Sequence, residues 1–336
     1  MKLEITPFTS LWMDNLYQKN IYNQGLNRLN LSGLKGSIRW WYEALIRGLG
    51  GYACDPTSGS ACILKNGEAL KKENPISHIQ GQICPACFLF GCNGFASRFR
   101  LGGVFKITGE GLQKIEKGEP FYVQVHDRPV MPVTVQEKTL LDMVFKFISN
   151  HGSIGGRTVL KPSSQDNKNI EGYSVDGRVR NSHVNFGICD LKLTPTSCKQ
   201  DGIMSFLESF KSWDGKENNS EHPDFKYIWF SSQILTRSDF NKVVGKQGYS
   251  HCYKQGATNE QKWLGGEKQA SSKKIFSFHT VDAANGYTNL PRTWGYVKAE
   301  KGSRKQFETL LNQPGVSLKP EKIQWGDAYL KQRGLD

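Results

Sequence analysis

Hydrophobic residues recur at helical spacing in the first third of the chain. A helix is predicted between residues 37 and 49, where apolar residues return every three or four positions. Its apolar arc consists of Ile38, Trp41, Tyr42, Leu45, Ile46 and Leu49. The opposite arc carries Arg39, Trp40, Glu43 and Arg47. The pattern therefore predicts an amphipathic helix with a basic face.

The rest of the chain alternates between strand-like and helix-like segments. Strands are predicted at residues 3–12, 98–107, 121–125, 186–193, 225–235, 275–281 and 292–299, and further helices at 135–150, 205–213 and 305–311. Strands and helices in this order, with the helices on one face of a sheet, indicate an α+β sandwich that is repeated or elaborated twice.

The length of the chain, 336 residues, predicts two domains. We place the first domain at residues 1–182 and the second at 183–336. The first domain contains a cysteine-rich insertion at about residues 52–95.

Charge and hydropathy restrict the partners of the protein. There are 44 Lys and Arg residues against 31 Asp and Glu, so the formal net charge is +13. Such an excess favours a polyanionic partner through long-range attraction. No window reaches the roughly 18 consecutive apolar residues of a membrane span, and the first residues lack the apolar run of a secretory signal. We therefore expect a cytoplasmic protein without membrane contact.

Five of the eight cysteines fall within one 39-residue stretch, which indicates a metal site rather than disulfides. Cys84 and Cys87 form a CxxC pair, whose spacing lets both sulfurs reach one ion from a single tight turn. Cys54 and Cys62 are the predicted second pair. Four thiolates leave no coordination position open for an activated water, so the predicted zinc ion is structural.

Other interpretations of the cysteines stay open. Cys92 or His78 could substitute for a member of the second pair. A CxxC can also be a redox pair, but that interpretation expects it to open a helix in a thioredoxin-like unit, and the flanking residues here resemble loops. Unligated buried thiols are the third possibility.

A glycine-rich segment, residues 151–158, follows the helix predicted at residues 135–150. Such a loop can bring backbone N–H groups close to a phosphate, and Arg157 would add a bidentate donor. A helix cap followed by a turn is the alternative. The segment lacks the Lys-Ser/Thr ending of a P-loop, which excludes nucleoside triphosphate binding of that kind.

Arginines are interleaved with aromatic residues in two places, around Trp40 and around Phe99. Single-stranded RNA is bound by this combination, because bases stack on rings while phosphates meet positive charge. For Arg39, an ion pair with Glu43 on its own helix is the alternative. The predicted RNA-binding residues are Arg39, Trp40, Arg47, Arg98, Arg100, His151, Gly152, Gly155, Gly156, Arg157 and Lys161.

No local motif predicts catalysis. GxSxG and HExxH are both missing, and none of the seven histidines lies within five residues of another. His151, beside the glycine-rich segment, is the one local candidate. We therefore assign no catalytic residue.

Four co-linear motifs carry a resemblance to a known family. They are Gly36–Leu45 (GSIRWWYEAL), Gly50–Thr57 (GGYACDPT), Ile83–Gly91 (ICPACFLFG) and Arg98–Leu101 (RFRL). Together they resemble the first Cmr subunits of type III-B CRISPR effector complexes, members of the RAMP superfamily. The glycine-rich segment is similar to the RNA-binding loop of that superfamily, although Val159–Pro162 stands where many RAMP loops have a second glycine-rich tip.

The resemblance implies two ferredoxin-like, RRM-related domains that bind the guide RNA near its 3′ end and contact other Cmr subunits. Target RNA is a further ligand that it allows. Target cleavage in such complexes belongs to the repeated backbone subunit, so the expected role is a non-catalytic subunit in antiviral defence. One alternative is a RAMP endoribonuclease that matures the guide or cuts the target with His151 or Asp55. The other is a zinc-dependent RNA- or protein-binding module outside CRISPR.

Overall fold

The computed structural model describes most of the chain. The described residues are 2–7, 30–65, 73–110, 118–155, 174–175, 178–179, 189–194, 202–210, 218–247, 252–266, 273–278 and 292–335. Three predicted RNA-binding residues, Gly156, Arg157 and Lys161, lie outside them.

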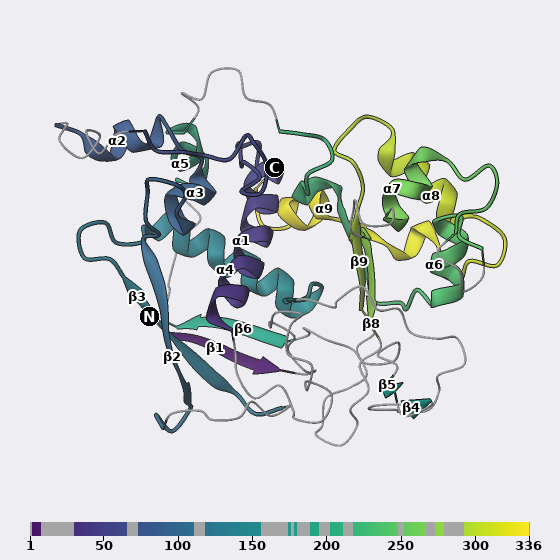
Figure 1. Cartoon of the computed structure of the whole chain (residues 1–336), viewed down its shortest axis with the longest axis horizontal. Helices are drawn as coiled ribbons and strands as arrows, with labels where there is room; N and C mark the ends of the chain where they lie inside the picture. Colours follow the sequence, from purple (N-terminus) through teal and green to yellow (C-terminus); the bar gives the residue numbers. More distant parts are fainter. Residues whose placement is uncertain are drawn as a thin grey trace.

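The first sheet is antiparallel, with strand order β2-β3-β1-β6. Its elements are β1 (Lys2–Pro7), α1 (Leu31–Gly48), β2 (Phe99–Lys106), β3 (Phe121–Asp127), α4 (Val135–Asn150) and β6 (Cys189–Thr194) (Figure 1). A βαββαβ order with the first strand between the third and fourth is the ferredoxin-like arrangement.

The second sheet repeats this arrangement, with strand order β10-β7-β9-β8 and antiparallel pairing throughout. Its elements are η3 (Phe225–Tyr227), β7 (Ile228–Ser231), α6 (Arg237–Val243), α7 (Asn259–Gly265), β8 (Ile275–Phe278), β9 (Arg292–Tyr296), α8 (Ser303–Leu311), η4 (Pro320–Lys322), β10 (Gln324–Trp325) and α9 (Gly326–Lys331). The predicted α+β class with two ferredoxin-like units is therefore confirmed.

The remaining elements are short. The cysteine-rich insertion between α1 and β2 contains α2 (Pro75–Gln80) and α3 (Pro85–Phe90). Between α4 and η3 lie a two-stranded sheet of β4 (Ser174–Val175) and β5 (Arg178–Val179), and the helix α5 (Ile203–Glu208). No helix in the described part of the chain is long and apolar enough to cross a membrane.

The boundary between the two units stays a prediction. Strand β6 lies after residue 182, yet it pairs with β1 along the whole strand, from Lys2 opposite Thr194 to Pro7 opposite Cys189. A division that keeps both sheets whole would therefore fall after Thr194.

Helix α4 has the predicted bounds, whereas α1 begins earlier than predicted. Asn30 caps α1, because its side-chain oxygen accepts hydrogen bonds from the N–H groups of Ser32 and Gly33, both at 3.0 Å. Helices α6, α7 and α9 were not predicted. Each has only six or seven residues, too few for an apolar stripe to repeat.

Helices α1 and α4 lie between the two sheets (Figure 1). On one side they cover the apolar face of the first sheet, including Leu3 and Ile5. On the other side aromatic residues of the second sheet pack against them: the ring of Trp41 lies 4.7 Å from that of Trp294, and Phe147 lies 5.3 Å from Phe230. The opposite face of the second sheet packs on α6, α7 and α8. The order of layers is thus sheet, helices, sheet, helices.

Hydrogen bonds to the last turn of α4 and to the residues that follow it join the two units. The indole N–H of Trp41 donates to the carbonyl oxygen of Ser153 at 2.9 Å, and that of Trp294 donates to the Ser153 hydroxyl at 3.2 Å. Arg292 of β9 donates to the carbonyl oxygen of Ile148 at 3.1 Å. The backbone just after α4 is therefore held by both units.

A buried ion pair connects the start of β2 to the start of α4. Arg98 Nη1 lies 2.5 Å from Glu137 Oε1, and the side chains are 4% and 0% exposed. The other Glu137 oxygen accepts from the N–H and hydroxyl of Thr134, which completes a capping box. Burial raises the pKa of Glu137, and Arg98 and Thr134 oppose that rise.

We expect Arg98→Ala to lower the free energy of unfolding by about 3–5 kcal/mol, because it leaves the Glu137 carboxylate buried without its partner. The measurement is guanidinium unfolding. Arg100→Ala, two residues later at an exposed position of β2, is the matched control and should change stability by about 0.5 kcal/mol or less. Equal effects of the two substitutions would contradict this role for Arg98.

Phe147→Ala should destabilise the whole molecule by about 3–5 kcal/mol, because the fully buried ring contacts Trp41 of the first unit and Phe230 of the second. Tryptophan fluorescence and far-UV circular dichroism should report one shifted unfolding transition. Val130→Ala, at a side chain that is 93% exposed, serves as the control. A shift confined to one of two separate transitions would show that the units unfold independently.

Candidate functional site

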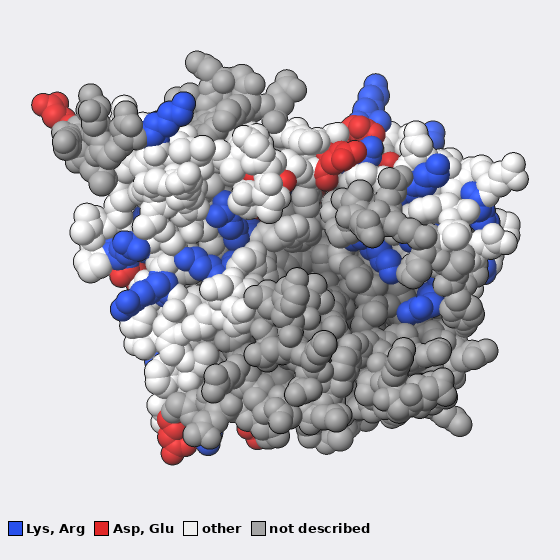
Figure 2. Space-filling model, viewed as in Figure 1, with Lys and Arg blue, Asp and Glu red and all other residues white. Residues whose placement is uncertain are grey.

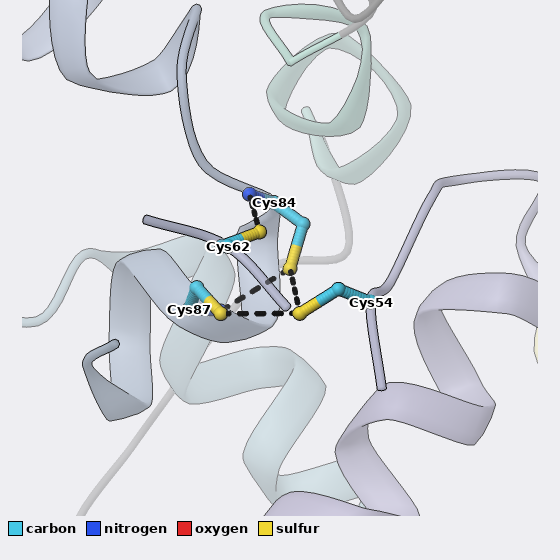
Figure 3. Close-up of side chains that lie close together, drawn as sticks. All are labelled: Cys54, Cys62, Cys84 and Cys87. Atoms are coloured by element: carbon cyan, nitrogen blue, oxygen red, sulfur yellow. Dashed lines mark hydrogen bonds between the residues drawn. The ribbon is translucent and has the colours of Figure 1, made fainter. Parts of the chain in front are cut away.

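The structure brings together the four cysteines predicted as metal ligands (Figure 3). Cys54 and Cys62 lie in the loop that follows α1, Cys84 is the N-cap residue of α3, and Cys87 lies in the first turn of that helix. All four are buried, and their sulfur atoms lie within 4.8 Å of one another. The cysteine cluster thus joins two segments of the insertion.

The spacing of the sulfur atoms fits a metal ion. A tetrahedral site with metal–sulfur distances of about 2.3 Å has sulfur–sulfur edges of about 3.8 Å. The Cys54 and Cys87 sulfurs lie 3.4 Å apart, and those of Cys84 and Cys54 lie 3.9 Å apart. Backbone N–H groups of Cys84 and Cys87 donate to the sulfurs of Cys62 and Cys84, both at 3.4 Å. Such N–H groups stabilise negative charge on sulfur.

Close packing of the four thiols shifts their pKa values in opposite directions. Hydrogen bonds from the three neighbouring thiols lower the pKa of Cys54. The same bonds raise the pKa values of Cys62 and Cys87, and burial raises that of Cys84. A bound divalent cation would allow all four thiols to ionise.

Neither predicted substitute belongs to the cluster. Cys92 is half-buried and His78 is exposed on α2, and the metal-binding group found among the described residues contains neither of them. The CxxC pair does open a helix, α3, where the sequence pattern indicated a loop. The helix follows a turn rather than a strand, so the thioredoxin-like unit of a redox pair is not formed around α3.

Two arginines of α1 hold the loops that carry the cysteines. Arg39 Nε lies 2.7 Å from Glu43 Oε1, as the ion-pair alternative predicted, and its other nitrogens donate to the Gly91 carbonyl at 2.8 Å and to the Cys87 sulfur at 3.2 Å. Burial raises the pKa of Glu43 to about 7, although Arg39 opposes the rise.

Arg47 is a buried structural residue, and its predicted place on a basic surface is wrong. Its side chain donates to the carbonyl oxygens of Ala53 and Cys54, at 2.9–3.2 Å, and to that of Pro223 in the second half at 2.8 Å. The residue is 4% exposed. The polar arc of α1 is covered by the insertion and the second unit, and helical periodicity alone does not distinguish such an arc from a surface.

The predicted RNA-binding residues near β2 differ in exposure. Arg98 is 3% exposed and forms an ion pair with Glu137. Its predicted place on an RNA-binding face is therefore wrong, because its side chain is buried like that of Arg47. Arg100 is exposed. Trp40 is half-buried and packs against Trp41 and Tyr296, with ring centroids 4.9 Å and 5.9 Å away. The structure therefore does not gather these residues on one face.

The described part of the glycine-rich segment belongs to the joint between the units. The His151 ring lies 4.1 Å from that of Phe230, and burial lowers the pKa of His151 to about 4. A Cβ atom at Gly152 would lie 2.9 Å from the Trp41 ring. Gly155 has a φ of +81°, and its N–H donates to the Ser37 hydroxyl at 3.0 Å.

Sequence reasoning missed two polar arrangements. Lys35 donates to the Ser97 hydroxyl at 2.6 Å, and burial with the nearby Arg128 and Arg39 lowers its pKa to about 8. Lys35 precedes the predicted start of the helix, so the periodicity did not include it. On the face of the molecule drawn in Figure 2, the Lys and Arg side chains of the described residues lie in separate groups rather than as one continuous basic surface.

The second missed arrangement pairs Asp55, which follows a cluster cysteine, with His222 of the second half. Asp55 Oδ2 lies 3.5 Å from His222 Nε2. Burial lowers the pKa of His222. No local spacing could reveal a pair whose members come from opposite halves of the chain.

Comparisons with known proteins agree with the resemblance at the level of the superfamily. Residues 5–160 match the model of the RAMP superfamily. No protein with a curated description matches the chain. Among solved structures, the crystal structure of Cmr1 from Pyrococcus furiosus in its apo form is similar, with a TM-score of 0.38 and 11% sequence identity over 99% of this chain and 96% of that chain. The family match covers the first ferredoxin-like unit up to the residues after α4. The likeness to the RAMP superfamily thus covers residues 5–160 of the 336 in this chain.

Proposed function

We propose that this protein is a non-catalytic RNA-binding subunit of a type III-B CRISPR effector complex, where it contacts the guide near its 3′ end and other Cmr subunits. The match of residues 5–160 to the RAMP superfamily carries the proposal. The four co-linear motifs between Gly36 and Leu101 support the narrower assignment. The net charge of +13 favours a polyanionic ligand such as RNA.

Fewer residues are proposed to contact RNA than the sequence predicted, because Arg47 and Arg98 are buried. Arg100 is exposed. Arg39 and Trp40 are partly accessible. Gly156, Arg157 and Lys161 stay in the proposal on their sequence motif. His151, Gly152 and Gly155 would act indirectly, by fixing the place where the glycine-rich segment leaves α4.

We also propose that the cysteine cluster binds one structural zinc ion. The carrying observation is the burial of four thiols whose sulfur atoms lie within 4.8 Å of one another, close enough to bind one ion. A zinc ion with four thiolate ligands would supply folding energy and no open position for chemistry. Cys54 and Cys62 would then be tied to the start of α3 through Cys84 and Cys87.

Two alternatives make different predictions for RNA. A RAMP endoribonuclease would need an acid and a base, and the pairing of Asp55 with His222 is the observation that favours such a site. A zinc-dependent module outside CRISPR would bind RNA or protein without assembling with other Cmr subunits.

Protein purified without added zinc should contain about one equivalent of the metal. Cys84→Ser should lose most of it and lower the melting temperature, because one of four ligands is removed. Cys189→Ser, at a buried cysteine outside the cluster, should keep the metal. Unchanged metal content in Cys84→Ser would exclude the proposed ligand set.

Affinity for single-stranded RNA should fall steeply between roughly 50 and 200 mM salt, because each phosphate contact adds about −0.7 to the logarithmic slope. Arg100→Ala and Arg157→Ala should each reduce that slope by about one contact. Lys305→Ala, at an exposed position on α8, is the control. The RNA should be recovered intact. Affinity that hardly depends on salt would contradict the proposal, and metal-independent cleavage would favour the endoribonuclease.

A further inference from the structure

The two sheets differ in how their faces are used. In the second sheet, the face that carries Phe230 and Trp294 is covered by α1 and α4. In the first sheet, the face that carries Leu3, Ile5 and Val123 covers the same two helices from the other side. The remaining face of the first sheet, here called the open sheet face, has exposed or half-buried side chains, chiefly Lys2, Arg100, Phe105, Tyr122, Gln124 and His126.

Two aromatic rings lie parallel on the open sheet face. Phe105 of β2 and Tyr122 of β3 are direct cross-strand partners. Their ring centroids are 5.3 Å apart and the ring planes differ by 21°. The ammonium group of Lys2 lies 4.3 Å from the centroid of the Tyr122 ring. Both rings are only half-buried, so they present aromatic surface to a ligand.

Glycines beside the rings keep the surface flat. Gly102 and Gly103 lie where the register of β2 shifts, between Leu101 and Val104. A Cβ atom at Gly102 would lie 2.7 Å from the His126 ring, and one at Gly103 would lie 2.7 Å from the Phe105 ring. Glycine within a strand often marks a place where a bulge forms or a ligand approaches the backbone closely.

Polar and cationic groups surround the rings. Arg100 is exposed and pairs across the strands with His126, and Gln124 is exposed opposite Lys2. Glu4 of β1 lies opposite Tyr122 on one side and opposite Lys192 of β6 on the other, and the Lys192 ammonium group pairs with Asp190 at 2.9 Å. A large contiguous apolar patch is typical of a protein interface. The groups flanking the two rings are mostly polar or cationic, with Ile107, two residues after Phe105 and 51% exposed, as the apolar exception. Stacked rings flanked by cations match the chemistry of nucleic acid bases and phosphates.

We propose that the open sheet face binds single-stranded RNA, with bases stacking on Phe105 and Tyr122 and phosphates contacting Arg100 and Lys2. The proposal deepens the RNA-binding function proposed above and rests on it. None of the residues except Arg100 belongs to the RNA-binding set predicted from the sequence. Four-stranded sheets with exposed aromatic residues bind single strands in this way because every base offers a π face.

The test uses the full chain and a fluorescent oligouridylate, with affinity measured by fluorescence anisotropy across a salt series. Phe105→Leu and Tyr122→Leu keep apolar volume but remove the rings. Each should weaken binding about fivefold or more, and should leave the salt slope unchanged because stacking releases no counterions. Tyr227→Leu, at a half-buried tyrosine of the second unit, is the matched control.

A third variant does not depend on the rings. Glu4→Lys reverses the charge opposite Tyr122 and should tighten binding and steepen the salt slope by about one contact. The Leu variants must retain the parent's melting temperature for their affinities to be compared; if they unfold, the result for Glu4→Lys decides.

The outcomes separate this inference from the function on which it rests. If the parent protein binds RNA with a steep salt dependence but the ring variants and Glu4→Lys bind like the parent, the open sheet face is not the RNA site and the proposed function stands. If ring variants bind RNA normally but no longer assemble with other Cmr subunits, the face is a protein interface and the inference is overturned. If the parent protein binds no RNA, the proposed function itself fails.

Discussion

The burial of α1 and α4 between two sheets is the constraint on which the rest of the structure depends. Each sheet has an apolar face to cover, and the same two helices cover both. Polar side chains on α1 therefore end up inside, where they need partners because burying an unpaired charge is costly. Arg39 and Arg47 meet this need with backbone carbonyls, a carboxylate and a thiol.

The cysteine cluster and these arginines are electrostatically linked. Four thiolates around a divalent ion carry two excess negative charges. Arg39 donates to the Cys87 sulfur, and Arg47 donates to the Cys54 carbonyl. With the proposed zinc ion in place, the arginines that suggested RNA binding in the sequence would compensate the charge of the metal centre. Their hydrogen bonds also anchor the insertion to α1.

The sequence predicted the features that local patterns encode. The bounds of α4 followed from its apolar stripe, and the clustering of Cys54, Cys62, Cys84 and Cys87 followed from their spacing within one segment. Contacts between distant segments were not predictable in this way. The pairing of Arg98 with Glu137 places a cation in the interior, and no residue near Arg98 in the sequence indicates this. The pairing of Phe105 with Tyr122 likewise depends on strand register, which a single strand does not reveal.

Strand β1 lies at the centre of the first sheet, yet its two partners are far away along the chain. Its residues pair with β3 from Gln124 back to Phe121, and with β6 from Thr194 back to Cys189. Until both partners have been synthesised, β1 has unpaired backbone groups on its edges, and such edges promote pairing with other chains. Long-range pairing of this kind slows folding. On the ribosome, this unit could therefore complete its sheet only after α1, the cysteine-rich insertion and α4 had already emerged.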